Sequence, residues 1–159
     1  MEKSKTVFVV VLDSRRKLVL WVLNKEDVVK NEDGTVKFTK PEGWGLPGGG
    51  TEEEDRNHDK DGFDLTEINA GKREVPEETG YYIELDKYDF RLDPEEREDH
   101  QIITFATTKF SGETHKHSIG EIKQVDWFPI YNPPKNAYKG HLRRYWKVIK
   151  ALKEMEALV

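Results

Sequence analysis

Three glutamates crowd the short segment Lys72–Gly80, "KREVPEETG". At about 100° of rotation per residue, Glu74, Glu77 and Glu78 share one face of a helix, and Glu67, one heptad earlier, falls on the same face. Like charges at these spacings destabilise an isolated helix, and a bound cation reverses the sign of that interaction. Carboxylate oxygens are the ligands that Mg²⁺ prefers, so this face predicts either a metal site or an ordinary solvated surface.

A glycine-rich loop, Gly43–Gly50, stands upstream of this acidic helix. Its sequence "GWGLPGGG" ends in three consecutive glycines, which allow the backbone to approach another group closely. Such a loop is weak evidence alone, since many are turns. Followed by an acidic helix, it can offer backbone carbonyls and amides beside a metal ion.

These two segments resemble the box of the Nudix hydrolases, G-x5-E-x7-R-E-U-x-E-E-x-G-U, where U is an apolar residue. The second half of the pattern is matched at every specified position from Arg73 to Tyr81, with Tyr81 counted as the last U. The first half departs from it, because Asp55 ends the count from Gly49 and about ten residues are inserted before Arg73. Asp55 and Glu67 are therefore the two candidates for the first acidic position.

The resemblance implies the roles of the matching residues. A divalent cation, Mg²⁺ or Mn²⁺, would be held by the Gly48 carbonyl and by Glu74, Glu77 and Glu78. Arg73 would orient the glutamates by ion pairing, with a surface salt bridge as its alternative role. The general base would be Glu121, in "GEIKQVDWF", or a box glutamate such as Glu77; Glu121 has the alternative of being an exposed strand residue.

The implied reaction is hydrolysis of a diphosphate linkage in a nucleoside diphosphate joined to another moiety. Trp44, Gly49 and Gly50 are expected to contact this small-molecule substrate, since aromatic rings can stack on a base. Nucleoside triphosphates or RNA 5′ ends compete with nucleotide sugars as the substrate class. A non-catalytic Nudix-fold nucleotide-binding module is the alternative from another functional class, although the intact "REVPEE" argues against it.

Hydrophobic patterning predicts the elements that must position these residues. A helix is expected over Leu65–Thr79, with Asp64 as N-cap, Glu67 completing a capping box and Gly80 as terminator. Spacings of three and four predict an amphipathic helix over Tyr138–Leu158. The expected strands form two hairpins, the second more exposed, and two later strands: Thr6–Leu12 with Leu18–Leu23, Val28–Val29 with Val36–Phe38, His100–Phe110, and Glu121–Ile130. This order indicates an α+β domain, and the resemblance implies the Nudix fold, an α/β/α sandwich with a mixed sheet.

Three polar segments have competing interpretations. The acidic insertion at about 55–64 suggests a Ca²⁺ loop, but its register fails, and a flexible loop or substrate lid is the main alternative. His115 and His117 are either substrate contacts or solvated side chains. Basic residues near Tyr138 are expected mainly on the wet face of the last helix, with phosphate or RNA binding as the alternative: Lys135, Lys139, His141, Arg143 and Arg144.

Composition bounds the remaining possibilities. The 159 residues are expected to form a single domain, 1–159, and the net charge of −5 disfavours a surface that coats nucleic acid. The absence of cysteine excludes disulfides and thiolate metal sites. The apolar run Val7–Leu12 is too short for a signal peptide or a membrane span, so no membrane association and a cytoplasmic location are expected. A homodimer remains an open alternative.

Overall fold

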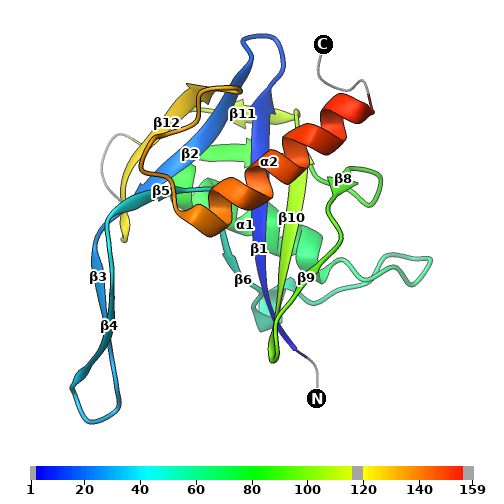
Figure 1. The fold of residues 1–159 in the computed structure, drawn as a ribbon. Coiled ribbons are helices and arrows are strands. Elements are labelled where there is room, and N and C mark those ends of the chain that lie inside the picture. The colour runs from blue at the N-terminus through cyan, green and yellow to red at the C-terminus, as the bar shows by residue number, and fades with distance from the viewer. Residues whose placement is uncertain (1–2, 116–119, 156–159) are drawn as a thin grey trace.

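The computed structural model describes residues 3–115 and 120–155 (Figure 1). A mixed β-sheet lies between two helices, α1 (Thr66–Thr79) and α2 (Lys139–Glu154), which cover its opposite faces. The sheet runs in the order β12 (Ile122–Pro129), β2 (Leu18–Asn24), β1 (Ser4–Asp13), β10 (His100–Thr107) and β8 (Phe90–Arg91). The predicted α+β class and the mixed sheet between helices are confirmed.

Strand β1 occupies the centre of the sheet. It runs parallel to β10, with Ser4 opposite His100 and Val11 opposite Thr107, and antiparallel to β2 at its far end. β2 pairs in turn with β12, and the short β9 (Glu95–Glu96) pairs with β10. Both helices and the glycine-rich loop are therefore positioned against β1.

The glycine-rich loop contains two short strands that its composition did not predict. β5 (Gly43–Gly45) pairs with β2, and β6 (Gly48–Gly50) pairs with β1 from Thr6 to Phe8. β1 and β2 pair directly only near their shared turn, which leaves the first half of β1 open on that side. β6 fills this gap, so the three glycines are held as sheet backbone.

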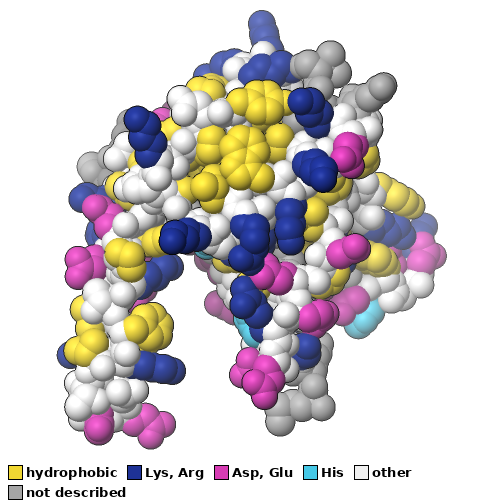
Figure 2. Space-filling model, in the orientation of Figure 1, with side chains coloured by type: hydrophobic (Ala, Val, Ile, Leu, Met, Phe, Trp, Pro, Cys, Tyr) yellow, Lys and Arg dark blue, Asp and Glu magenta, His cyan; other side chains and the backbone are white. Residues whose placement is uncertain are grey.

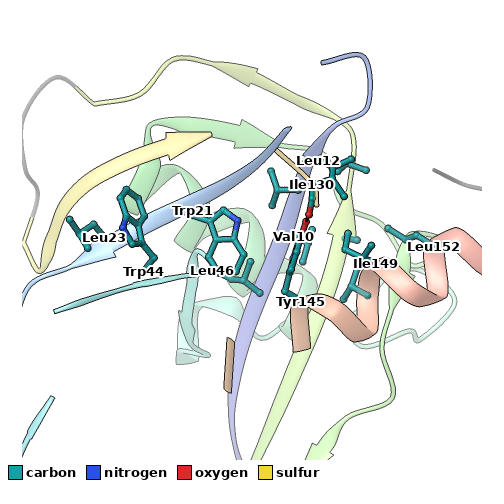
Figure 3. Close-up of a cluster of buried hydrophobic side chains, with 13 residues drawn as sticks. Val10, Leu12, Trp21, Leu23, Trp44, Leu46, Ile130, Tyr145, Ile149 and Leu152 are labelled. Atoms are coloured by element: carbon teal, nitrogen blue, oxygen red, sulfur yellow. Dashed lines mark hydrogen bonds between the residues drawn. The ribbon is translucent and has the colours of Figure 1, made fainter. Parts of the chain in front are cut away.

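Two hydrophobic clusters, one on each face of the sheet, form the core. Alternate residues of β1 point to opposite faces, so Val10 packs under α2 while Val7 and Val9 pack under α1. Figure 3 shows the α2 cluster, in which the rings of Trp21 and Tyr145 meet edge to face at 5.1 Å. Because each helix buries one face against its cluster, its position on the sheet and its rotation about its own axis are both fixed.

The second predicted hairpin is present and projects from the body. β3 (Asp27–Lys30) and β4 (Val36–Lys40) pair with each other as a separate two-stranded sheet. Figure 2 shows it as a finger that carries apolar side chains, among them the exposed Val28, Val36 and Phe38. A second separate pair joins β7 (Tyr81–Ile83) to β11 (Phe110–Gly112), where the long later strand was expected to end.

The ends of the helices differ in part from the prediction. α1 begins at Thr66, so Leu65, and not the predicted Asp64, occupies the N-cap position. The Asp64 carboxylate still accepts the Thr66 N–H at 2.9 Å, and Gly80 ends α1 as predicted, with a left-handed φ of 87°. The predicted capping box was wrong, because Glu67 bonds instead to Lys5 and Arg91. The end of the second predicted helix, 156–158, lies outside the described residues. No helix within 3–115 or 120–155 is long and apolar enough to cross a membrane.

Candidate active site

The glycine-rich loop and α1 meet in direct contact. The Gly48 N–H donates to the Glu78 carboxylate at 2.8 Å. At Gly49, an added Cβ would lie 2.5 Å from Glu74 Oε1, closer than side-chain atoms approach one another. A side chain at Gly49 would therefore displace the Glu74 carboxylate from this strand. At Gly48 an added Cβ would meet the backbone of Val7 and Phe8, so glycine is required there.

Arg73 lies at the centre of the carboxylates. Its Nη1 donates to Glu74 at 3.0 Å and to Glu77 at 3.3 Å. Its Nη2 donates to the Gly50 carbonyl at 3.0 Å, so one side chain ties the helix to the end of β6. These contacts hold two glutamates in place, as an orienting residue would.

Asp55, rather than Glu67, completes this arrangement. Its two carboxylate oxygens accept from Nε and Nη2 of Arg73, both at 3.0 Å, and one also accepts the Glu52 N–H at 2.8 Å. Burial alone would raise the pKa of Asp55, but the bonds from Arg73 and Glu52 outweigh it and hold that pKa below its usual range. Counting forward along the box pattern from Gly49 leads to Asp55. Counting back from Arg73 does not, because about ten residues are inserted between them.

Negative charge exceeds positive charge at this site. Burial raises the pKa of Glu78 to about 8; the Gly48 N–H opposes that rise, and the charges of Glu74, Glu77 and Glu121 add to it. The pKa of Glu74 is raised in the same direction, first by burial and then against the pull of Arg73. Glu121, which immediately precedes β12, is thus brought close enough to the box helix to act on Glu78.

The donor set fits a hard divalent cation. Asp55, Glu74 and Glu77 all bond to Arg73, and the charges of Glu74 and Glu77 act on Glu78. A cation beside the three box glutamates would lower the cost of burying their charge. Within the described residues, no three acidic or histidine side chains already surround a common point. Arg73 lies between Glu74 and Glu77, and Glu78 is bonded to Gly48, so metal binding requires these carboxylates to turn.

Other residues singled out from the sequence lie in different surroundings. Trp44 is buried in the α2 cluster, edge-on to Phe128 at 4.9 Å, and its predicted contact with substrate stays a prediction. His115 is exposed, with Nε2 3.1 Å from the Pro76 carbonyl. His117 lies outside the described residues.

Two of the C-terminal basic residues do not lie on the solvated face as expected: Arg144 is buried and His141 is half-buried. His141 Nδ1 accepts the Leu46 N–H at 3.0 Å, and its ring packs against Phe8 at 4.5 Å. Burial, with the charges of Arg144 and Lys40, lowers the pKa of His141 to about 3. Arg144 bonds to Glu95 at 3.1 Å. The Phe8 ring of β1 lies against both side chains, a contact between distant segments that a helical wheel does not reveal.

The acidic insertion forms its own hydrogen-bonded turn. One oxygen of Asp59 accepts the N–H groups of Asp61 and Phe63, and the other pairs with Lys87 at 3.1 Å. These bonds use the oxygens that a Ca²⁺ loop would direct at an ion. The insertion is anchored at both ends, because Asn69 donates to the Asp55 carbonyl and Leu65 N–H donates to the Asn57 carbonyl.

Comparison with known proteins agrees with this geometry. The profile of the NUDIX domain matches residues 2–148. The chain belongs to the Nudix family. As a Nudix domain it is a pyrophosphohydrolase, an enzyme that cleaves diphosphate bonds. No curated protein matches the sequence significantly.

Several solved structures share the Nudix fold with this chain. A MutT NUDIX hydrolase from Burkholderia pseudomallei is 19% identical and superposes with a TM-score of 0.60, over 93% of this chain and 99% of its own. The E. coli ORF135 protein is 18% identical, with a TM-score of 0.53 over 96% and 92%. A UDP-X diphosphatase is 18% identical, with a TM-score of 0.54 over 95% and 64%. At such identities the likeness is one of fold.

Proposed function

We propose that this Nudix domain uses a divalent cation to hydrolyse the diphosphate linkage of a nucleotide-type substrate, a nucleoside diphosphate joined to a further group. The observation that carries the proposal is the excess of carboxylates around Arg73, held in contact with a glycine strand. A diphosphate also needs positive charge beside it, and a cation bound by these carboxylates provides it.

The metal ligands would be the Gly48 carbonyl, Glu74, Glu77 and Glu78. When bound, Mg²⁺ or Mn²⁺ neutralises the diphosphate and lowers the pKa of water. Arg73 holds Glu74 and Glu77 in place through bonds of 3.0 and 3.3 Å, and Asp55 holds Arg73. Gly49 and Gly50 carry no side chain, so the substrate can approach the backbone of the strand.

A carboxylate must take the proton of the attacking water. Water adds to phosphorus, its proton passes to the carboxylate, and the bond to the leaving phosphate breaks. Glu121 is exposed and acts on Glu78 by its charge, so it lies at the edge of the carboxylate cluster, where a base has access to water. Glu77, also exposed, is the alternative base.

The Glu77→Gln variant tests the proposal. Cleavage of nucleoside triphosphates, dinucleoside diphosphates and nucleotide sugars is measured with Mg²⁺ and with Mn²⁺ by following the nucleotide products, because only the triphosphates release phosphate or pyrophosphate. We expect a loss of at least about 10²-fold in kcat, the usual size for an acid–base group. Glu54→Gln is the matched control, because Glu54 is exposed and lies 3.6 Å from the same arginine. Unchanged turnover in Glu77→Gln would remove Glu77 from the mechanism.

The alternatives are separate outcomes of the same screen. Cleavage of 5′-triphosphorylated RNA in preference to every small nucleotide would favour the RNA 5′-end reaction. Binding of nucleotides by the wild type without cleavage of any compound would favour a non-catalytic module.

A further inference from the structure

A polar pocket of about 610 Å³ adjoins the carboxylate site. It lies where the first residues of β1, the end of β6, the acidic insertion and His100 come together, near the N-terminal end of the chain in Figure 1. This volume is within the range that encloses a small ligand. The residues proposed to bind the metal and the diphosphate do not account for this pocket.

The pocket and the carboxylate cluster share residues. Gly50 lines the pocket, and its carbonyl accepts from Arg73 at 3.0 Å. Glu52 also lines it, with its carboxylate 3.8 Å from Nη1 of Arg73, the atom that bonds Glu74. A group joined to a diphosphate on the box glutamates can therefore enter the pocket along the end of β6.

The acidic insertion supplies the outer wall. His58 and Asp64 line the pocket and pair with each other as an isolated β-bridge. The insertion is tied to α1 by the bond of 2.9 Å from Asn69 to the Asp55 carbonyl. The wall is therefore built by hydrogen bonds within this chain, and Arg73 is bonded to the same Asp55.

The lining is poorly suited to a nucleobase or to a phosphate. None of the described residues that line it is Phe, Tyr or Trp, so a base finds no aromatic platform. Its lysines and its arginine are already paired: Lys3 with Glu96 at 2.8 Å, Lys5 with Glu67 at 3.1 Å and Arg56 with Glu53 at 3.3 Å. A phosphate would have to break these pairs to gain its countercharges.

The lining is well suited to hydroxyl groups. Ser4 and Thr6 place hydroxyls on the two ring nitrogens of His100, at 2.6 and 2.7 Å. Thr51, His58 and carboxylates complete a wall that offers both donors and acceptors. A ligand with many hydroxyls can both donate to and accept from such a wall.

We propose that this pocket binds a polyhydroxylated group, a sugar, carried by the substrate on the far side of the diphosphate. This inference rests on the proposed function, since the diphosphate on the box glutamates places the sugar here. The insertion then determines substrate choice, and its role is recognition rather than metal binding.

The His58→Trp variant tests the pocket by filling it from an exposed position. ADP-glucose and ATP are the paired probes, assayed with Mg²⁺. We expect KM for ADP-glucose to rise at least tenfold while kcat/KM for ATP changes less than twofold. Lys60→Trp is the control, because Lys60 is an exposed residue of the same insertion and does not line the pocket. Equal losses on both probes, or no loss on either, would overturn the proposal.

Binding is measured separately from hydrolysis, so that the two proposals can fail independently. Saturation-transfer NMR with Mg²⁺, recorded before cleavage is appreciable, follows the protons of bound ADP-glucose. We expect the hexose protons to receive saturation in the wild type and to lose it in His58→Trp. If neither probe is cleaved, the proposed function fails for these substrates, while hexose saturation still supports the pocket. A wild type that saturates only the adenosine protons overturns the pocket.

Discussion

Two clusters of arginine and carboxylate lie on the two helices that cover opposite faces of the sheet. On α1, Arg73 lies within 4.0 Å of five acidic side chains, Glu52, Glu54, Asp55, Glu74 and Glu77. On α2 the ratio is reversed, because Glu95 alone pairs with Arg97, Arg143 and Arg144. The α1 cluster therefore has an excess of negative charge, and the α2 cluster has an excess of positive charge.

The two excesses are compensated in different ways. Arg144 is buried under Phe8, 5.3 Å from its ring, and burial lowers its pKa against the pull of Glu95. Its Nε has no hydrogen-bond partner among the described residues, yet the aromatic face and Glu95 stabilise the cation. Among the described residues, Glu78 has the Gly48 N–H but no ion pair with a basic side chain, and burial raises its pKa to about 8. The excess charge of the α2 cluster is stabilised by groups of the protein itself, whereas the α1 cluster is suited to binding a cation from solution.

Asp55→Ala gives the largest expected effect. Removing the buried partner of Arg73 leaves a guanidinium with unpaired donors, so we expect the free energy of unfolding to fall by about 3–5 kcal/mol. Urea unfolding measures it, and kcat should fall as well because Arg73 no longer holds Glu74. The exposed Glu54→Ala is the control, with a change below about 0.5 kcal/mol. A loss in Asp55→Ala as small as in the control would contradict a structural role for the pair.

Glu95→Gln separates the two clusters. It removes the countercharge of the buried Arg144, and we expect the free energy of unfolding to fall by about 2 kcal/mol. Because this cluster lies on the other helix, kcat and the Mg²⁺ requirement should stay within twofold of the wild type. Thermal unfolding and a steady-state assay measure the two effects. A tenfold fall in kcat would show that the two clusters are coupled and do not act independently.

His141→Gln probes how α2 supports the glycine-rich loop. The folded pKa of His141, about 3, lies below the unfolded value, so the unfolded chain binds the extra proton and stability falls as pH drops below about 6.5. We expect this histidine to account for roughly 2 kcal/mol of the stability lost between pH 7 and pH 5. Urea unfolding at the two pH values should show a shallower loss in His141→Gln. The exposed His115→Gln should keep the full dependence; identical slopes in all three proteins would contradict the assignment.

Pro76→Ala is expected to have the smallest effect. Proline removes the N–H that would bond the Lys72 carbonyl, and α1 ends three residues later at Thr79. Alanine restores that donor in the last turn, so we expect a gain in stability of less than about 1 kcal/mol and unchanged Mg²⁺ affinity. Isothermal titration with Mg²⁺ checks the affinity. A clear weakening would mean that the proline adjusts the glutamates.

Much of the fold could be predicted because its signals are local. The β-branched run in β1 and the spacing of apolar residues in α2 each indicate one element by its own period. The capping box failed because Glu67 found Lys5 and Arg91, partners distant in sequence. β5 and β6 were missed because glycines carry no strand signal; an open edge of β1 recruits them.

The sequence by itself determined the box: the spacing from Arg73 to Gly80 places three glutamates on one helix face whatever packs against it. Only the tertiary structure decided that Asp55 joins Arg73 across the insertion and that Arg144 is buried and His141 half-buried. It also decided that the insertion forms one wall of a pocket. The physical reason is that helical periodicity follows from bond geometry along the chain. Burial and pairing depend instead on which distant segments fold against each side chain.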